Sequence, residues 1–352
     1  MKIAFIEPHL QLYGAIRRIM ELSNRLVRRG EDVTVYHPGG GPCEWMHGVA
    51  KTRPTRELFD TEHDVVIFND PPDYKLARKA RAKLKVFYVL CLYEREKLKK
   101  FNPKIFWIRK GRTLSLKRAL QMPFLRLANA TWMQTYLAQD LGLESHLLLG
   151  GVNRDVFHPL EAVKGEVAAA ENRRKALENR RAAPETGRAF RILCSGDTRE
   201  RKGLDTIRAA LERVTTHHAH VVLDTYHDKG IPQKEMAETY GRADLFVDAQ
   251  RYAGWNNPVA EAMACGTPVV CSDIGGVADF AVHEETALLV PVGDAEALAG
   301  AIRRAIGDPM LCDRLKSNAL AKISQFDWER SADTLRDILR THLSQNWGGQ
   351  AA

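Results

Sequence analysis

The chain has 352 residues, of which 45% are hydrophobic and 27% are charged, and its formal net charge is +8. This length accommodates two domains of ordinary size, and this composition is typical of a soluble globular protein rather than a disordered one. No apolar run approaches the roughly 18 residues of a membrane-spanning helix, and the cysteines lack CxxC spacing, so neither a zinc site nor a disulfide framework is predicted.

The positive charge has three competing interpretations. Much of the excess lies between Lys75 and Arg118, and it suits a solvated surface, a nucleic-acid partner or an anionic membrane surface. A solvated surface is the simplest of the three. No helix-turn-helix, RNA-recognition or zinc-finger pattern is visible, so the sequence disfavours nucleic acid.

The first half of the chain predicts strands that alternate with helices. Residues 16–30 carry apolar side chains at the one-sided spacing of an amphipathic helix. Gly14, before this helix, would let a ligand approach the backbone, although an ordinary helix start explains it equally well. The apolar N-terminal stretch is too short for a signal peptide. Apolar runs typical of buried strands occur at residues 2–7, 32–37, 63–70 and 84–92.

Residues 93–121 interleave lysines and arginines with aromatic residues, and periodicity alone does not order them. Two interpretations remain open. Basic and aromatic side chains together bind anionic bilayers, where each cation near the surface contributes about 1 kcal/mol. An ordinary helix–loop pair, whose lysine stems cover apolar surface, fits equally well.

A change of composition separates the two halves of the chain. Residues 160–188 are rich in Ala, Glu, Arg and Lys and nearly lack large apolar side chains, which predicts an exposed helix and a linker. Strands and helices alternate again from Phe190, and Asp294 is expected to cap a helix. The sequence therefore predicts an α/β protein of two doubly wound domains whose strand C-terminal ends face a shared cleft.

The stretch from Arg251 to Gly276 is the main candidate for a binding site. It runs through turn formers into Pro258, which suits the first turn of a helix, and that helix carries Glu261. Gly266 ends the helix, and a buried strand follows. Such a helix start presents unpaired N–H groups and the positive end of the helix dipole, so the sequence predicts an anion-binding site.

With these motifs in place, the chain resembles the retaining glycosyltransferases of family 4 (group 1) over nearly its whole length. The resemblance implies the GT-B fold, in which two Rossmann-like domains face each other across a cleft. The similar motifs are the glycine loop and helix at residues 14–36, GGVNRDVFHP at 150–159, ADLFVDAQRYAGWNNPVAEAMACGTPVVCSDIGGVADF at 243–280 and FDWERSADTL at 326–335. The implied parts are an acceptor-side domain at residues 1–158, a linker or exposed helix at 159–188, a nucleotide-sugar-binding domain at 189–325, and a helix at 326–352 that packs back on the first domain.

The resemblance also implies roles for single residues. Glu261 matches the second glutamate of the family's Glu-x7-Glu motif, a ribose-hydroxyl acceptor, although a helix acid that only complements the dipole is the alternative. Lys202, with Arg199 in the same loop, would stabilise charge on the departing nucleotide. The further donor-binding residues implied are Gly196, Gly254, Trp255, Asn256, Asn257 and Pro258. The acceptor-side residues implied are Gly14, Asp70 and Tyr93.

Three departures from the family pattern bear on activity. The family's first glutamate falls at Ala253, so a side chain that normally contacts the sugar or its phosphate is missing. The arginine expected after Gly196 is Asp197, an anion that Coulomb repulsion disfavours beside a diphosphate unless a neighbour such as Arg199 offsets it. The histidine often found after the fourth strand is absent from residues 91–94.

These residues predict a retaining glycosyltransferase that moves a sugar from a UDP- or GDP-linked donor to a glycan or lipid-linked acceptor in cell-envelope or polysaccharide synthesis. No cofactor and no metal is implied. The expected location is cytoplasmic, with peripheral contact at the inner face of the membrane if residues 93–121 bind lipid. Ala253 and Asp197 keep open a weakly active or non-catalytic nucleotide-sugar-binding protein, and the shared fold keeps open a sugar-nucleotide epimerase.

Overall fold

The structure, a computed structural model, describes residues 1–11, 13–46, 48–91, 103–160, 189–215, 220–229 and 231–348. It divides into two compact units: unit 1 is Met1–Gly151 with Trp328–Ala352, and unit 2 is Val152–Asp327. The sequence placed the first boundary at residue 158, whereas Val152 donates its N–H to the Phe326 carbonyl (3.0 Å) inside unit 2. The linker expected at 159–188 lies outside the described residues from residue 161 onward.

Unit 1 is built on a seven-stranded parallel sheet in the order β3-β2-β1-β4-β5-β6-β7. Its strands are β1 (Lys2–Ile6), β2 (Asp32–His37), β3 (Lys51–Pro54), β4 (His63–Phe68), β5 (Ala82–Val89), β6 (Leu125–Ala128) and β7 (His146–Leu147). Its helices are α1 (Gly14–Arg28), α2 (Tyr74–Lys79), α3 (Pro103–Gln121), α4 (Thr131–Gln139) and α11 (Trp328–Gly348), with the 3-10 turns η1 (Thr55–Phe59) and η2 (Pro71–Asp73). The edge strand β3 lacks an apolar run and β7 is only 2 residues long, and the sequence did not predict either strand.

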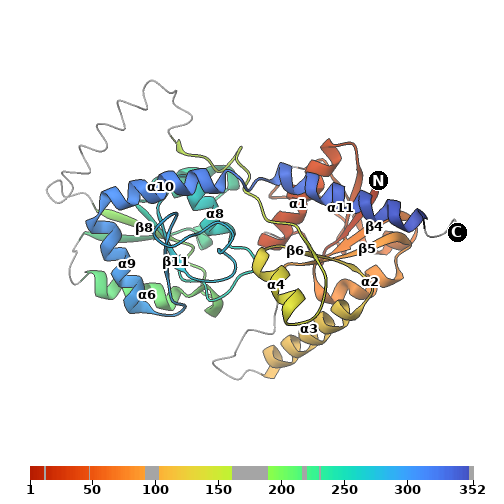
Figure 1. The fold of residues 1–352 in the computed structure, drawn as a ribbon, viewed down its shortest axis with the longest axis horizontal. Coiled ribbons are helices and arrows are strands. Elements are labelled where there is room, and N and C mark those ends of the chain that lie inside the picture. Colours follow the sequence, from red (N-terminus) through yellow and green to blue (C-terminus); the bar gives the residue numbers. More distant parts are fainter. Residues whose placement is uncertain are drawn as a thin grey trace. The chain divides into compact units, whose positions relative to one another are not determined.

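Alternate residues of these strands face two helical layers. Ile3 and Phe5 of β1 share a buried cluster with α1 and α11, whereas Ala4 and Ile6 share another with α2, α3 and α4. Figure 1 shows α1 and α11 on one side of the sheet and α2, α3 and α4 on the other. Because both faces are covered, the central strands carry near-continuous apolar runs, such as Ile3–Ile6 of β1 and Val65–Phe68 of β4, which made them predictable.

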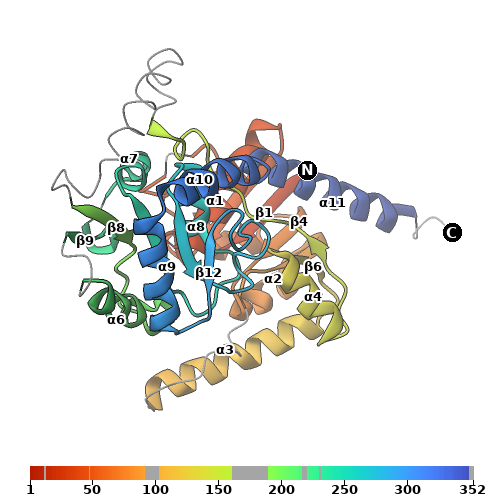
Figure 2. The same cartoon turned by 60° about the vertical axis from the view of Figure 1, so that its left-hand side comes forward.

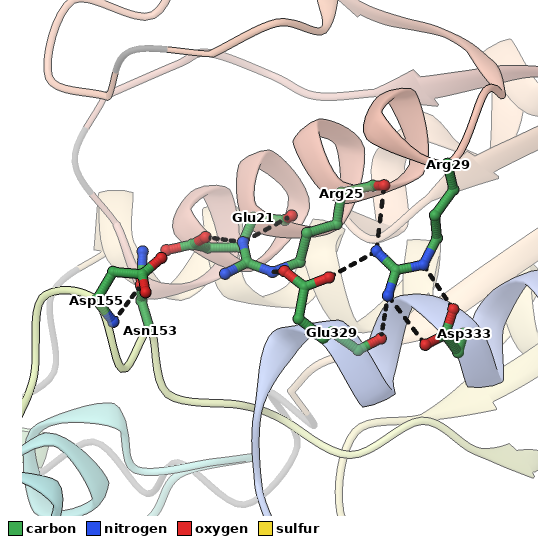
Figure 3. A network of polar contacts seen from close by, with 7 residues as sticks. All are labelled: Glu21, Arg25, Arg29, Asn153, Asp155, Glu329 and Asp333. Carbon is green, nitrogen blue, oxygen red and sulfur yellow. Dashed lines mark hydrogen bonds and ion pairs between the residues drawn. The ribbon is translucent and has the colours of Figure 1, made fainter.

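The C-terminal helix α11 packs beside α1, and charged side chains join the two helices (Figure 3). Arg29 donates to Glu329 Oε2 at 2.7 Å and to Asp333 Oδ2 at 2.9 Å. The hydrogen bond to Asp333 is the largest cause of the raised pKa of Arg29. Both acids are about half exposed, so each pair contributes at most about 1 kcal/mol. Burial of Leu335 and Leu339 in the α1 cluster contributes more.

Unit 2 is built on a five-stranded parallel sheet in the order β12-β11-β10-β8-β9. Its strands are β8 (Phe190–Cys194), β9 (Val221–Thr225), β10 (Leu245–Asp248), β11 (Val269–Ser272) and β12 (Leu288–Val290). Its helices are α6 (Leu204–Thr215), α7 (Met236–Gly241), α8 (Asn257–Ala264), α9 (Ala295–Gly307) and α10 (Pro309–Ile323), with the 3-10 turns η5 (Glu200–Lys202), η6 (His227–Lys229) and η7 (Gln233–Glu235). The two sheets confirm the predicted α/β class.

The sheet of unit 2 is also covered on both faces. α6, α9 and α10 form one buried cluster with Ile192 and Val247, and α6 and α9 lie side by side in Figures 1 and 2. On the other face, the Phe246 ring packs against Tyr240 of α7, with 5.4 Å between the ring centroids. The same alternation of side chains therefore produces two layers of helices in each unit.

Two helix starts of unit 2 show what the sequence revealed and what was overlooked. Asp294 accepts a hydrogen bond from the Ala297 N–H at 2.9 Å, so the predicted cap of α9 is confirmed. The sequence did not predict α10. Its start signals were nevertheless present, because Asp308 caps it by accepting from the Leu311 N–H at 2.9 Å and Pro309 opens it.

Each sheet has one position where the direction of winding reverses. In unit 1 this switch point lies between β1 and β4, because β1 pairs with β2 on one side and β4 on the other. In unit 2 it lies between β8 and β10, because β8 pairs with β9 and β10. Ligands of open α/β sheets bind at the carboxyl ends of the strands that flank such a point. The loops after these four strands are therefore where binding residues are expected.

Candidate functional site

The loop after β8 brings a buried acid and an exposed base together. Gly196 has a φ of 76°, and a Cβ there would lie 2.6 Å from the Thr225 Cβ, so glycine alone fits. Arg199 donates to Asp197 Oδ1 from its backbone N–H and from Nε, both at 3.0 Å. Burial acts to raise the pKa of Asp197, but the hydrogen bonds from Arg199 lower it to about 2. Asp197 is thus a carboxylate whose charge Arg199 offsets.

Lys202, which ends η5, joins this loop to the loop after β10. Its Nζ donates to Gln250 Oε1 at 2.6 Å. Burial lowers the pKa of Lys202 to about 8, and the nearby Asp248 opposes that shift. The two loops meet closely, since Gly203 has a φ of 68° and a Cβ there would lie 1.9 Å from the Ala249 carbonyl oxygen. A lysine whose ammonium loses its proton near pH 8 therefore lies at the β8/β10 switch point.

Asp248, the last residue of β10, organises the polar groups behind Lys202. Its Oδ1 accepts hydrogen bonds from the Gln250 N–H and from Asn256 Nδ2, both at 3.0 Å. Burial raises the pKa of Asp248, and the Lys202 ammonium counteracts this. Asp248 thereby connects the Lys202 loop to the residue that precedes α8. The sequence did not single out Asp248 or Gln250, although a polar residue at the end of an apolar strand run was a usable signal.

Helix α8 begins as the sequence predicted, with Asn256 before it and Pro258 in its first turn. The Asn256 N–H donates to the Gly276 carbonyl at 2.9 Å, so this amide is already engaged within unit 2. Asn256 Oδ1 is buried and has no hydrogen-bond partner among the described residues. Asn257 and Pro258 are partly exposed at the helix start. The solvent-accessible start of α8 is thus at Asn257 and Pro258 rather than at Asn256.

The preceding residues of this loop are buried in unit 2. The Trp255 ring packs on Phe280 and Phe326, with centroid distances of 4.8 and 5.5 Å, and Gly254 is buried beside it. These ring contacts anchor the loop between Gln250 and α8 in the core of unit 2. The roles of Gly254 and Trp255 in donor binding stay predictions.

Ala253, where the family carries its first glutamate, is buried at 8% exposure. It lies against the following turn, because a Cβ on Gly276 would be 2.8 Å from the Ala253 Cβ and 2.7 Å from its carbonyl oxygen. A methyl group packed on a turn therefore occupies a position where the family presents a carboxylate.

Glu261 lies one turn into α8 and is buried at 7% exposure. The Tyr240 hydroxyl donates to its Oε2 at 3.1 Å, and the Tyr226 hydroxyl lies 3.3 Å from that of Tyr240. Burial raises the pKa of Tyr240, which keeps the phenol a neutral donor. A carboxylate can accept several hydrogen bonds at once, so Glu261 suits hydroxyl recognition.

The acceptor-side residues fall in different places. Gly14 is exposed at the first position of α1. Asp70 follows β4 and pairs with Arg112 of α3. Tyr93 lies outside the described residues. Two buried side chains beside Asp70, Glu7 and Asn69, were missed although each directly follows an apolar strand.

Two further properties concern the whole described chain. Among the residues that the structure describes, no helix combines the length and apolar character that crossing a bilayer requires. Within the same residues, no group of three or more His, Cys, Asp or Glu side chains could hold a metal ion.

The chain is similar in sequence to several known proteins. Residues 226–322 match the family model described as glycosyl transferases group 1. The lipopolysaccharide core biosynthesis mannosyltransferase LpcC of Rhizobium leguminosarum bv. viciae is 32% identical over 225 residues, which are 56% of this chain and 59% of that protein. A D-inositol 3-phosphate glycosyltransferase of Jonesia denitrificans is 34% identical over 110 residues, 31% of this chain and 26% of that protein. The chain thus matches less than two thirds of each relative.

The chain is similar in fold to solved structures over nearly its whole length. Sucrose-phosphate synthase from Thermosynechococcus elongatus superposes with a TM-score of 0.73 at 19% identity, covering 98% of this chain and 99% of that one. Anabaena Alr3699/HepE in complex with UDP and glucose has a TM-score of 0.69 at 17% identity, covering 97% and 99%. The fold is GT-B, with two Rossmann-like units, as predicted.

The chain resembles the group 1 glycosyl transferases. The residues that match this family include β10, α8 and β11, and therefore Glu261 and its loop, whereas Lys202 and Arg199 precede them. The sequence motifs had predicted this resemblance, and the match confirms it at the level of the group. The narrower assignment to family 4 stays a prediction.

Proposed function

We propose that the protein is a glycosyltransferase that moves a hexose from a nucleotide-sugar donor to a hydroxyl of a glycan or lipid-linked acceptor during assembly of a cell-envelope polysaccharide. The observation that carries this proposal is the placement of Lys202 and Glu261 around the β8/β10 switch point of unit 2. The names of the relatives, a mannosyltransferase of lipopolysaccharide core biosynthesis among them, support the substrate class.

The donor is expected to lie along the carboxyl edge of the unit 2 sheet. The Lys202 ammonium, held by Gln250, supplies positive charge for the diphosphate. Arg199 offsets Asp197, so this acid does not repel the diphosphate as an unpaired anion would. The start of α8 adds the positive end of a helix dipole. Glu261 then accepts hydrogen bonds from the ribose hydroxyls of the nucleotide.

The proposed reaction proceeds with retention and needs no protein nucleophile. The departing diphosphate accepts the proton of the acceptor hydroxyl while the new glycosidic bond forms on the same face of the sugar. The protein contributes by positioning the two substrates and by stabilising the charge that develops on the diphosphate. Lys202 is the residue best placed to stabilise the charge on the diphosphate.

The acceptor is proposed to bind unit 1, near Asp70. Helix α3 adds a second proposal, peripheral contact with an anionic membrane, because Lys110, Lys117 and Arg118 are exposed along it. Residues 92–102, and the side chains of 103–109, lie outside the described residues. Flotation with anionic liposomes at low salt tests this contact, and an absence of binding would reject it.

A melting-temperature screen across UDP- and GDP-linked sugars tests the function. A ligand at 100 times its Kd adds about 2.7 kcal/mol of stability, so the true donor should raise the Tm clearly. Transfer of radiolabelled sugar from that donor to membrane or glycan fractions should follow. Binding without turnover on any acceptor would favour the non-catalytic alternative that Ala253 suggests, and no binding by any nucleotide sugar would contradict the proposal.

A further inference from the structure

The switch point of unit 1 holds a buried acid that the donor chemistry does not use. Glu7 directly follows β1 and is 1% exposed. Its Oε1 accepts a hydrogen bond from Asn69, the residue after β4. Its Oε2 is buried and has no hydrogen-bond partner among the described residues. An unpaired buried polar atom costs about 1–3 kcal/mol, so a ligand atom that hydrogen-bonds to this oxygen would be stabilised at this position.

Two more carboxyl groups approach Glu7 at this edge. Asp70 is paired with Arg112 of α3. Asp73, in η2, has an Oδ2 that is buried and unpartnered among the described residues. Burial and then repulsion from Asp73 and Asp70 raise the pKa of Glu7, and burial and Asp70 raise that of Asp73 to about 7. Among the described residues Arg112 is the guanidinium that pairs with this cluster, so the three acids together carry net negative charge when all of them ionise.

The chemistry of this cluster selects the kind of group that can complete it. Burial raises the pKa of both Glu7 and Asp73, and a carboxyl group with a raised pKa donates an O–H while it holds its proton and accepts hydrogen bonds once it is ionised. A hydroxyl group satisfies both, because it accepts one hydrogen bond and donates another. A phosphate would be repelled, and an ammonium group could only donate. The described residues form no metal-binding group here.

We infer that Glu7 and Asp73 form a binding site on unit 1 for a hydroxyl group of a neutral sugar or polyol. Asn69 orients Glu7 through the side-chain hydrogen bond, and the Asp70–Arg112 pair borders Asp73. This inference rests on the proposed function, in which the hydroxyl-bearing ligand is the acceptor. It adds that the acceptor part bound at this point is uncharged, and it assigns the recognition to two acids outside the donor site.

The test uses the full chain and three variants. Glu7→Gln and Asp73→Asn each replace a carboxyl by an amide of the same shape. Asp64→Asn is the matched control, because Asp64 lies at the opposite end of β4, where it accepts from the Lys2 N–H and from Lys83, both at 2.8 Å. The probes are the methyl glycosides of mannose, glucose and galactose, methyl glucosaminide as an ammonium and glucose 1-phosphate as an anion. Saturation-transfer NMR measures their affinities, and calorimetry measures that of UDP.

At least one neutral glycoside should bind the wild type and Asp64→Asn, and bind Glu7→Gln and Asp73→Asn about tenfold more weakly. UDP affinity should be equal in all four proteins. The inference is overturned if no neutral glycoside binds the wild type, if both variants bind as the wild type does, or if only methyl glucosaminide or glucose 1-phosphate binds. If one variant fails to fold, the other decides. Failure of UDP to bind any protein would contradict the proposed donor site and leave the glycoside result standing.

Discussion

The two switch points of this protein occupy the same position in similar sheets and carry different charges. In unit 2, the loops after β8 and β10 present Lys202, with Asp197 already paired to Arg199 and Asp248 buried beneath. In unit 1, the loops after β1 and β4 present Glu7, Asp70 and Asp73, and among the described residues Arg112 pairs with Asp70. The comparison shows two separate contributions. The fold determines where a ligand binds, and the side chains determine which ligand charge is preferred.

This difference suits a transferase with two unlike substrates. A nucleotide diphosphate carries negative charge and needs cations and helix N-termini. An acceptor hydroxyl is neutral and needs a group that can both donate and accept. Under the proposed function, unit 2 suits the diphosphate of the donor and unit 1 suits a neutral hydroxyl of the acceptor.

The largest expected effect comes from removing the cation of unit 2. Lys202→Ala should lower the rate of sugar transfer by about 100-fold or more, because one lost charge-stabilising donor commonly costs that much. Lys234→Ala is the control, since Lys234 is exposed in η7 and should leave the rate unchanged. Initial rates with the donor found by the melting screen measure both. Equal rates in Lys202→Ala and the wild type would remove Lys202 from the site.

A smaller effect is expected from pH. The pKa of Lys202 is lowered to about 8 by burial, with Asp248, Arg201, Asp197 and Arg199 as the charged neighbours. The ammonium is present below that pH and is lost above it, so UDP affinity should weaken as the pH rises from 7 to 9. Lys202→Arg, which keeps its charge, should flatten this decline. A decline of the same size in that variant would assign the titration to another group.

A separate effect, on stability rather than on substrate binding, concerns Asp73 of unit 1. The folded pKa of Asp73 is raised to about 7 by burial and Asp70, above the roughly 3.9 of an unfolded aspartate. Ionisation is therefore disfavoured in the folded state, and stability from this group is lost as pH rises between those values. Because the two pKa values differ by about three units, Asp73→Asn should gain about 3 kcal/mol on the wild type between pH 4.5 and pH 7.5. Urea unfolding at both values measures this, and an unchanged difference would show that Asp73 ionises freely.

Much of the fold could be predicted from local sequence, but few of the hydrogen bonds and ion pairs of the candidate site could. Buried strands such as β1 and β4 were predictable because parallel strands covered on both faces carry near-continuous apolar runs. The edge strand β7 is 2 residues long, which is too short for periodicity to reveal. Helix α10 was missed although its cap and proline were present.

In the candidate site too, the sequence identified single residues but not the contacts between them. Lys202 and Glu261 were identified through a family resemblance, and the structure adds their partners, Gln250 and Tyr240. Glu7 was overlooked because its significance depends on Asn69, which lies 62 residues away in the chain and meets it only when β1 pairs with β4. Contacts of this kind follow from strand order, which local periodicity does not specify.

Hydrogen-exchange mass spectrometry with and without UDP tests the central claim most directly, because it reports where on the chain the nucleotide binds. UDP should slow exchange in peptides that cover residues 195–203 and 251–261 of unit 2, and leave those covering residues 3–11 and 66–74 of unit 1 unchanged. Protection of the unit 1 peptides without protection of the unit 2 peptides would contradict the assignment of the two switch points.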